Sequence, residues 1–153
     1  MSRKFCRRRH YALVSPIDMA ISGATITTEE DLDKIRMREL TAIDNFGTGK
    51  ATPSDFRDVC DMLNLAQTMA EMGIGPEVLR VCTYVERTLL ACKDEWDADG
   101  RMDVDEFEMA GLRDLYEYHD LQRTSVDRRA YEQAIARTRN KIRSAHPAVK
   151  VLA

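Results

Sequence analysis

Apolar positions recur along most of the chain at the three- and four-residue spacing of amphipathic helices. From about residue 28 to residue 146 this spacing appears in five long segments, which are separated by short stretches rich in glycine, proline or acidic residues. No long segment alternates strictly between apolar and polar residues, as a half-buried strand would. We therefore expect an all-α fold: a single-domain bundle of five main helices, with a short helix before them over about residues 16–22.

The segment that follows Thr52 and Pro53 is apolar on almost every side. Threonine followed by proline is typical of a helix start, because the hydroxyl caps free N–H groups and proline fits the first helical position. The apolar residues leave only a narrow polar strip: Phe56, Val59, Cys60, Met62, Leu63, Leu65, Ala66, Met69, Ala70 and Met72. A helix of this kind belongs at the centre of a bundle, so we expect it to be the most buried.

Each of the other main helices shows a narrower apolar stripe, which we expect to face the core. In the helix that ends at Gly47 the stripe is Leu32, Ile35, Leu40, Ala42, Ile43 and Phe46. In the helix that begins at Pro76 it is Val78, Val81, Cys82, Val85, Leu89, Cys92 and Trp96. In the next helix it is Phe107, Ala110, Gly111, Leu115, Tyr118 and Leu121, with His119 outside it as a surface or packing residue. In the last helix, which Ser125 would cap, it is Tyr131, Ala134, Ile135 and Ile142.

The segment from Asp94 to Phe107 separates the two halves of the bundle and carries the densest negative charge. It resembles an EF-hand calcium loop when Gly100 takes the sixth position, where glycine makes the sharp turn. The ligand positions are then occupied by Glu95, Asp97, Asp99, Asp103 and Glu106. Two features depart from the pattern: Glu95 stands where a shorter aspartate is usual, and Asp94 stands where the entering helix normally has an apolar residue.

The same segment also fits the start of a helix. Asp103 followed three residues later by Glu106 is a capping-box arrangement, in which each side chain bonds the other residue's backbone N–H. Gly100 would then end or reverse the turn. Calcium loops of this kind usually come in pairs, and the chain has no second one. We favour the helix start and expect no metal ligands and no cofactor; a degenerate, single EF-hand-like calcium loop is an alternative.

Length and cysteine content are those of an ordinary reduced domain. A chain of 153 residues can bury a sufficient core without disulfides. We divide it into a basic arm (1–14), a helical domain (15–146) and a C-terminal tail (147–153). Cys6, Cys60, Cys82 and Cys92 show no C-x-x-C spacing, and the last three fall on apolar faces, which favours a cytoplasmic protein. With no apolar run of about 20 residues and no secretory signal at its start, we expect no membrane partner.

Charge is separated along the chain although the net charge is only −3. Residues 1–14 carry five basic and no acidic side chains, whereas residues 94–120 carry eleven acidic and two basic ones. Residues 121–153 are basic again, with eight basic and two acidic side chains. This separation favours electrostatic attraction of charged partners. Alternatively, the basic ends fold near the acidic middle and compensate its charge.

No short catalytic motif is found. The chain lacks G-x-S-x-G, a P-loop, G-x-G-x-x-G and H-E-x-x-H. Its densest carboxylates lie in an open polar segment, which is a poor place to raise a pKa for acid–base work. We therefore expect a protein that is not an enzyme.

Several soft motifs together carry a resemblance. They are the start with Arg3-Lys4 and Arg7-Arg8-Arg9, the turn over residues 69–75, the Tyr118-His119-Asp120-Leu121-Gln122 segment, and the Tyr131, Ala134, Arg137-Thr138-Arg139 helix. In these features most of the chain resembles small helical proteins carried by phages, prophages and plasmids of Gram-negative bacteria, some of which are labelled Fis-like regulators. The resemblance implies an origin in a mobile element and implies no particular activity.

Two functional hypotheses follow. The first is a non-enzymatic interaction protein that binds and modulates a host macromolecule, such as a nucleic-acid-handling or defence protein. Its acidic docking surface would consist of Asp97, Asp99, Asp103, Asp105 and Glu108. The alternative is a DNA- or RNA-binding regulator that uses the arm and the last helix, through Arg3, Lys4, Arg7, Arg8, Arg9, Arg129, Arg137 and Arg143. The net acidic charge favours the first, and neither hypothesis fixes the oligomeric state.

Overall fold

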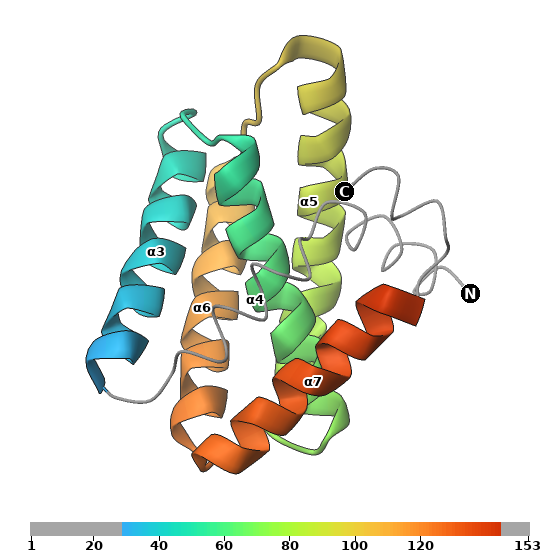
Figure 1. The fold of residues 1–153 in the computed structure, drawn as a ribbon. Coiled ribbons are helices and arrows are strands. Elements are labelled where there is room, and N and C mark those ends of the chain that lie inside the picture. The colour runs from blue at the N-terminus through green and yellow to red at the C-terminus, as the bar shows by residue number, and fades with distance from the viewer. Residues whose placement is uncertain (1–28, 145–153) are drawn as a thin grey trace.

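The computed structural model describes residues 29–144, and these form five helices (Figure 1). Their bounds are α3, Glu29–Gly47; α4, Pro53–Glu71; α5, Val78–Asp99; α6, Glu106–Thr124; and α7, Arg128–Ser144. The predicted all-α bundle of five main helices is therefore confirmed. The expected short first helix, the basic arm and the tail lie outside the described residues. Among the described helices, none is long and apolar enough to cross a membrane.

Helix α4 lies at the centre of the bundle and packs against each of the other four helices. In Figure 1, α3, α5 and α6 run alongside it, while α7 crosses obliquely at one end. Every residue from Val59 to Ala70 is buried, which confirms the expectation that this helix is the most buried. Even the narrow polar strip is covered: Thr138 of α7 donates its hydroxyl hydrogen to Thr68 Oγ1 at 2.7 Å.

The start of α4 is determined by the residues from Thr52 to Asp55. Thr52 Oγ1 accepts a hydrogen bond from the Asp55 backbone N–H at 3.3 Å, and Asp55 Oδ2 accepts one from the Thr52 N–H at 2.8 Å. Pro53 occupies the first turn, where its missing N–H costs nothing. The predicted cap is confirmed, with Asp55 completing a capping box.

Other helix boundaries differ from those expected. Helix α5 begins at Val78, two residues after Pro76, and continues to Asp99. Gly100 ends it in the left-handed conformation, with φ of 68°, and its N–H donates to Trp96 O at 2.9 Å. The expected acidic loop over 94–107 is therefore wrong at both ends, because acidic residues are compatible with a helix and glycine marks the true end.

The caps of α6 and α7 also move by two residues. Asp105, rather than Asp103, caps α6, because Asp105 and Glu108 each accept a hydrogen bond from the other's backbone N–H, at 2.8 and 2.9 Å. Asp127, rather than Ser125, caps α7 by accepting from the Ala130 N–H at 2.8 Å. In both cases the capping geometry was predicted and its position was wrong.

The largest correction concerns the face of α6 that meets the core. Phe107, Tyr118 and Leu121, expected inside, are 81%, 39% and 66% exposed. Ala110 is exposed as well, whereas Gly111 and Leu115 are buried as expected. The other buried residues of α6 are Met109, Leu112, His119, Gln122 and Arg123. Leu40 on α3 is likewise 38% exposed, while its neighbour Glu39 is buried. Polar side chains on α3 and α6 pair with one another inside, which leaves part of the apolar surface of both helices outside.

Candidate interaction surface

An open groove of about 480 Å³ runs between α5 and α6 on the outside of the bundle. Three of its lining residues are aromatic: Tyr84 from α5, and Phe107 and Tyr118 from α6. All three belong to the six large hydrophobic side chains that the described residues expose. A contiguous apolar surface bordered by polar residues is a common mark of a protein-binding site. The groove is therefore the first candidate for function.

Small residues bring the two helices close together within this groove. Val81, Ala110 and Gly111 line it between the aromatic side chains. A Cβ atom on Gly111 would lie 2.6 Å from Cδ1 and 2.7 Å from Cε1 of Tyr84, which is closer than real carbon atoms approach. The Tyr84 ring therefore lies directly against the α6 backbone. The absence of a side chain at Gly111 fixes the position of this aromatic ring.

The groove also contains charged side chains. Glu77, Arg80 and Asp114 contribute to its lining. None of the three forms an ion pair with another residue of the 29–144 segment. Two carboxylates and one guanidinium are thus available to a ligand beside the aromatic surface.

The acidic residues proposed from the sequence gather at the end of α5 and the start of α6. This end of α5 extends beyond the ends of α3 and α4 in Figure 1. Asp97 and Asp99 are exposed in the last turn of α5, Asp103 and Asp105 are exposed in the connection, and Glu108 is half-buried in the first turn of α6. The structure therefore brings all five predicted residues to one end of the molecule.

Several of these acids already have a local role. Lys93 Nζ lies 3.0 Å from Asp97 Oδ2, and Arg101 Nη2 lies 3.2 Å from Asp103 Oδ2. Such exposed pairs contribute little to stability and are readily exchanged for other partners. Asp105 and Glu108 cap α6, so their replacement would also loosen the helix start.

Helix α5 passes through the positions that an EF-hand loop would need. Glu95, Asp97 and Asp99 are all helical, and residues two apart on a helix point to different sides. They cannot converge on one ion while the helix persists. Within residues 29–144 no group of three or more His, Cys, Asp or Glu side chains is placed to hold a metal ion.

The basic residues proposed for nucleic acid are only partly placed. Arg129, Arg137 and Arg143 are all exposed on α7, on the side away from its buried stripe. The first and last are separated by 14 positions, or about 21 Å along a helix. Arg3, Lys4, Arg7, Arg8 and Arg9 lie outside the described residues. A one-sided arginine face on α7 is therefore observed, whereas its combination with the arm is not.

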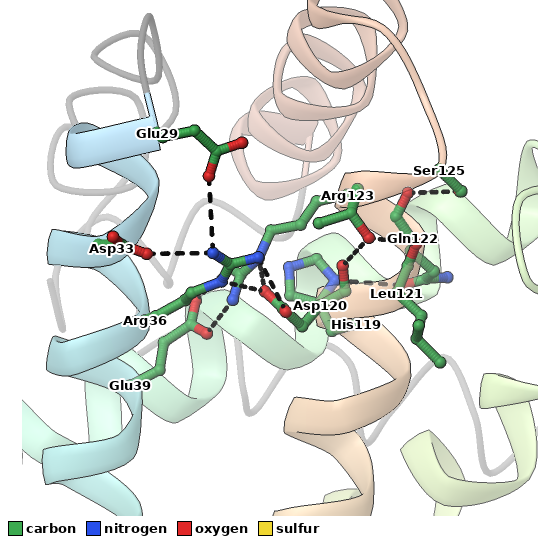
Figure 2. A network of polar contacts seen from close by, with 11 residues as sticks. Glu29, Asp33, Arg36, Glu39, His119, Asp120, Leu121, Gln122, Arg123 and Ser125 are labelled. Carbon is green, nitrogen blue, oxygen red and sulfur yellow. Dashed lines mark hydrogen bonds and ion pairs between the residues drawn. The ribbon is translucent and has the colours of Figure 1, made fainter.

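A network of ion pairs joins α3 to α6 on the inner side of both helices (Figure 2). The Arg123 guanidinium donates from Nη1 and Nη2 to both carboxylate oxygens of Glu39, each at 2.8 Å, and from Nε to Asp120 at 2.9 Å. Arg36 donates two further hydrogen bonds to Asp120, at 2.9 and 3.1 Å. The Arg123 side chain is only 1% exposed, so this pair depends on its geometry to offset desolvation.

The network also sets proton affinities. Burial alone would raise the pKa of Asp120, but hydrogen bonds from Arg36 and Arg123 hold it below its usual value. Burial would likewise lower the pKa of Arg123, but Glu39 raises it, so the guanidinium stays charged. The α3–α6 contact therefore contains fixed charges of both signs at physiological pH.

His119 lies beside this network and is fully buried. Gln122 donates from its amide nitrogen to Ala66 O at 3.2 Å and to Ile74 O at 2.8 Å, so its oxygen faces His119 Nδ1 at 3.0 Å. That arrangement requires the imidazole hydrogen on Nδ1. Burial, assisted by the nearby positive charge of Arg123, lowers the pKa of His119 to about 4. The ring is therefore neutral and packed in the core. Of the two expected roles, that of a packing residue is confirmed, whereas the expected position outside the inward stripe is wrong.

The three cysteines of the described segment lie inside the bundle. Cys60, Cys82 and Cys92 are buried in the core, as their apolar positions predicted. Burial raises the pKa of Cys60 well above its usual value and that of Cys92 to about 12. At neutral pH these two thiols are protonated, and the thiolate is the nucleophilic form.

Comparison of the chain with protein-family models, with curated proteins and with solved structures gives no match.

Proposed function

We propose that this chain is a non-enzymatic interaction protein that binds a partner macromolecule through α5 and α6. The observation that carries the proposal is the exposure of Phe107, which is 81% exposed beside Tyr84 and Tyr118 in the groove. Buried aromatic side chains dominate the energy of protein interfaces, because they remove a large rigid apolar area from water. An exposed group of three is most simply explained as an interface without its partner.

The acidic end of the molecule supports a basic partner. Phe107 follows Asp105 and Glu106 directly, so one end of the aromatic groove lies close to the acidic end of the molecule. Complementary charge mainly accelerates association and excludes wrong partners, while apolar contacts hold the complex. The resemblance to proteins of mobile elements makes a host protein the natural class of partner, such as a nucleic-acid-handling or defence protein.

The chemistry of the described residues supports a binding role over a catalytic one. His119 is neutral and fully buried, and the Cys60 and Cys92 thiols are buried and protonated at neutral pH. None of these groups lines the groove. A general base or a nucleophile must reach its substrate, and these three residues do not.

Site-specific photocrosslinking tests this proposal. A photoreactive amino acid at position 107 should give a discrete adduct in a host lysate, whereas one at Met37, exposed on α3 outside the groove, should not. Charge reversal at Asp97, Asp99 and Asp103 should slow formation of that adduct at low salt. Equal adducts from positions 107 and 37, or an adduct insensitive to charge reversal, would contradict a specific acidic and aromatic surface.

The arginine face of α7 favours direct nucleic-acid binding as a second candidate function. Arg129, Arg137 and Arg143 form no ion pair with the described residues, so their charges are available to phosphates. Gel shifts with duplex DNA at two salt concentrations test it, since each lost phosphate contact lowers the slope of log affinity against log salt by about 0.9. Submicromolar, salt-sensitive binding that is lost in the triple Arg→Gln variant or on deletion of residues 1–10 would rank this function first.

A further inference from the structure

The shape of the α5–α6 groove selects the kind of partner segment. The exposed residues Phe107, Asp114, Tyr118 and Leu121, together with Gly111, follow one another along α6 at spacings of three and four. This is the pattern of a helix that packs against another helix. From Phe107 to Leu121 the row spans 14 residues, or about 21 Å, which is long enough for about four turns of a partner helix.

We infer that the occupant of this groove is a basic amphipathic helix of a partner protein, an inference that rests on the proposed function. Two adjacent helices offer a furrow into which a third helix packs its ridge of side chains. The small, exposed residue Ala110 permits close approach of a partner between the aromatic side chains. Bulky apolar residues at every third or fourth position of the partner would contact Tyr84, Phe107 and Tyr118.

Charge complementarity determines the polar side of the partner helix. Two carboxylates line the groove: Asp114 in the middle of the α6 row, and Glu77 next to the start of α5. Arg80 is the single basic residue that lines the groove. Lysine or arginine residues flanking the apolar stripe would therefore be attracted to these two carboxylates, and the acidic residues of an acidic helix would be repelled by them.

The same charge pattern argues against a second copy of this chain as the occupant. In an antiparallel pairing of two α6 rows, Phe107 of each copy would lie near Leu121 of the other, because both are seven residues from Asp114. The two Asp114 carboxylates would then meet at the symmetry axis, where like charges repel each other. A basic helix from another protein avoids this repulsion.

Synthetic peptides test the inference with the full-length protein. The probe is a helical peptide of about 18 residues with leucine at three- and four-residue spacing and lysine elsewhere. One control peptide replaces lysine with glutamate, and the other replaces leucine with serine. By fluorescence anisotropy, the lysine–leucine peptide should bind at least about tenfold more tightly than either control, since both the apolar anchors and the charges contribute.

Matched protein variants locate the binding. Phe107→Ser should weaken the lysine–leucine peptide at least about tenfold, and Asp114→Lys about fivefold. Met37→Ser and Asp44→Lys, which change an exposed methionine and an exposed aspartate on α3, should leave affinity within about twofold. Gly111→Ala, which displaces the Tyr84 ring, should also weaken binding.

Each other outcome overturns the inference in a recognisable way. Equal binding of the glutamate–leucine peptide, or no effect of Phe107→Ser, removes the basic helix as the occupant. Self-association in sedimentation that Phe107→Ser abolishes would assign the groove to a second copy. A crosslinked adduct at position 107 without peptide binding would refute the helical occupant and leave the proposed function standing, whereas loss of both would refute the two together.

Discussion

Helices α4 and α6 both consist of 19 residues and start from capping boxes, yet they use their apolar residues in opposite ways. In α4, every position from Val59 to Ala70 is buried, including polar ones. In α6, the inward positions include His119, Gln122 and Arg123, while Phe107 and Leu121 are exposed. Helix α4 buries its apolar residues in the core, whereas α6 leaves several of its own exposed to solvent.

The difference shows that buried polar contacts between α3 and α6 can hold α6 in place while some of its apolar residues stay exposed. The bidentate pair between Arg123 and Glu39, with Asp120 and Arg36 beside it, joins α6 to α3 without using Phe107 or Leu121. Buried ion pairs need good geometry to offset desolvation, so they are not an obvious route to stability. Here their consequence is a helix with a second, outward apolar face. The predictions below test each side of this comparison, from the largest expected effect to the smallest.

The sharpest test of the polar interior is Arg123→Met. Removing the guanidinium leaves Glu39, whose side chain is 6% exposed, as a buried charge without its bidentate partner. We expect the free energy of unfolding to fall by about 3–5 kcal/mol, measured by urea denaturation. Arg113→Met, which changes an exposed arginine on the same helix, should cost less than about 0.5 kcal/mol.

The double variant Glu39→Met/Arg123→Met serves as the second control. Replacing both members of a buried ion pair with apolar residues of similar size is often neutral. We therefore expect the double variant to recover most of the stability lost by Arg123→Met. A loss below about 1 kcal/mol in Arg123→Met would mean that the polar interior does not secure α6.

Sequence periodicity predicted α4 well because a helix that is buried on every side leaves no choice of face. It was only partly right for α6 because that helix has two apolar stripes. One contains Phe107, Tyr118 and Leu121, which are exposed, and the other contains the buried Met109 and Leu112. Hydrophobicity alone cannot show which stripe faces the core. The choice depends on the ion pairs of Arg123 with Glu39 and of Asp120 with Arg36, and the partners in each pair are 84 residues apart in the sequence.

The candidate site was predicted in part. The acidic residues from Asp97 to Glu108 could be grouped from their proximity in the sequence, although the helical course of residues 94–99 was missed because Gly100, not the acids, ends α5. The groove could not be predicted, because it needs α5 and α6 side by side and Tyr84 against Gly111. Two of its aromatic residues, Phe107 and Tyr118, had been assigned to the core because aromatic residues are often buried.

A pair of leucine truncations compares the two helices directly. Leu63 on α4 is fully buried, so Leu63→Ala should lower the free energy of unfolding by about 2–5 kcal/mol. Leu121→Ala on α6 should change it by less than about 0.5 kcal/mol, because that side chain is 66% exposed. Similar losses in the two variants, measured by urea denaturation, would show that the outward face of α6 is a second core surface.

The buried imidazole of His119 on α6 should make the stability of the chain depend on pH. The pKa of His119 is lowered from 6.5 to about 4 in the folded chain. Between these values the unfolded chain binds a proton that the folded chain does not, so stability falls as the pH is lowered from 6.5 to 4. Protonation of His119 should lower the free energy of unfolding by about 3 kcal/mol between pH 6.5 and pH 4, and it should have no effect above this range.

His119→Asn isolates that contribution. The variant should be less stable than the wild-type chain at pH 7, and the difference should narrow by about 3 kcal/mol by pH 4. Burial raises the pKa of Asp58 to about 6, which acts in the opposite direction between pH 4 and 6. Because both proteins contain Asp58, its effect cancels in the difference. A constant difference across the range would mean that His119 already titrates normally in the folded chain.

The smallest expected stability change carries the most information about function. Phe107→Ser removes a side chain that is 81% exposed, so the free energy of unfolding should change by less than about 0.5 kcal/mol. The same variant should lose the crosslinked partner and the basic helical peptide. Leu112→Ala, on the buried face of α6, should show the reverse: a loss of about 2–5 kcal/mol in stability with peptide affinity retained under conditions where the variant is folded. If Phe107→Ser instead destabilised the chain by more than about 1 kcal/mol, the aromatic groove would be a structural surface, and the contrast between α4 and α6 would be one of degree.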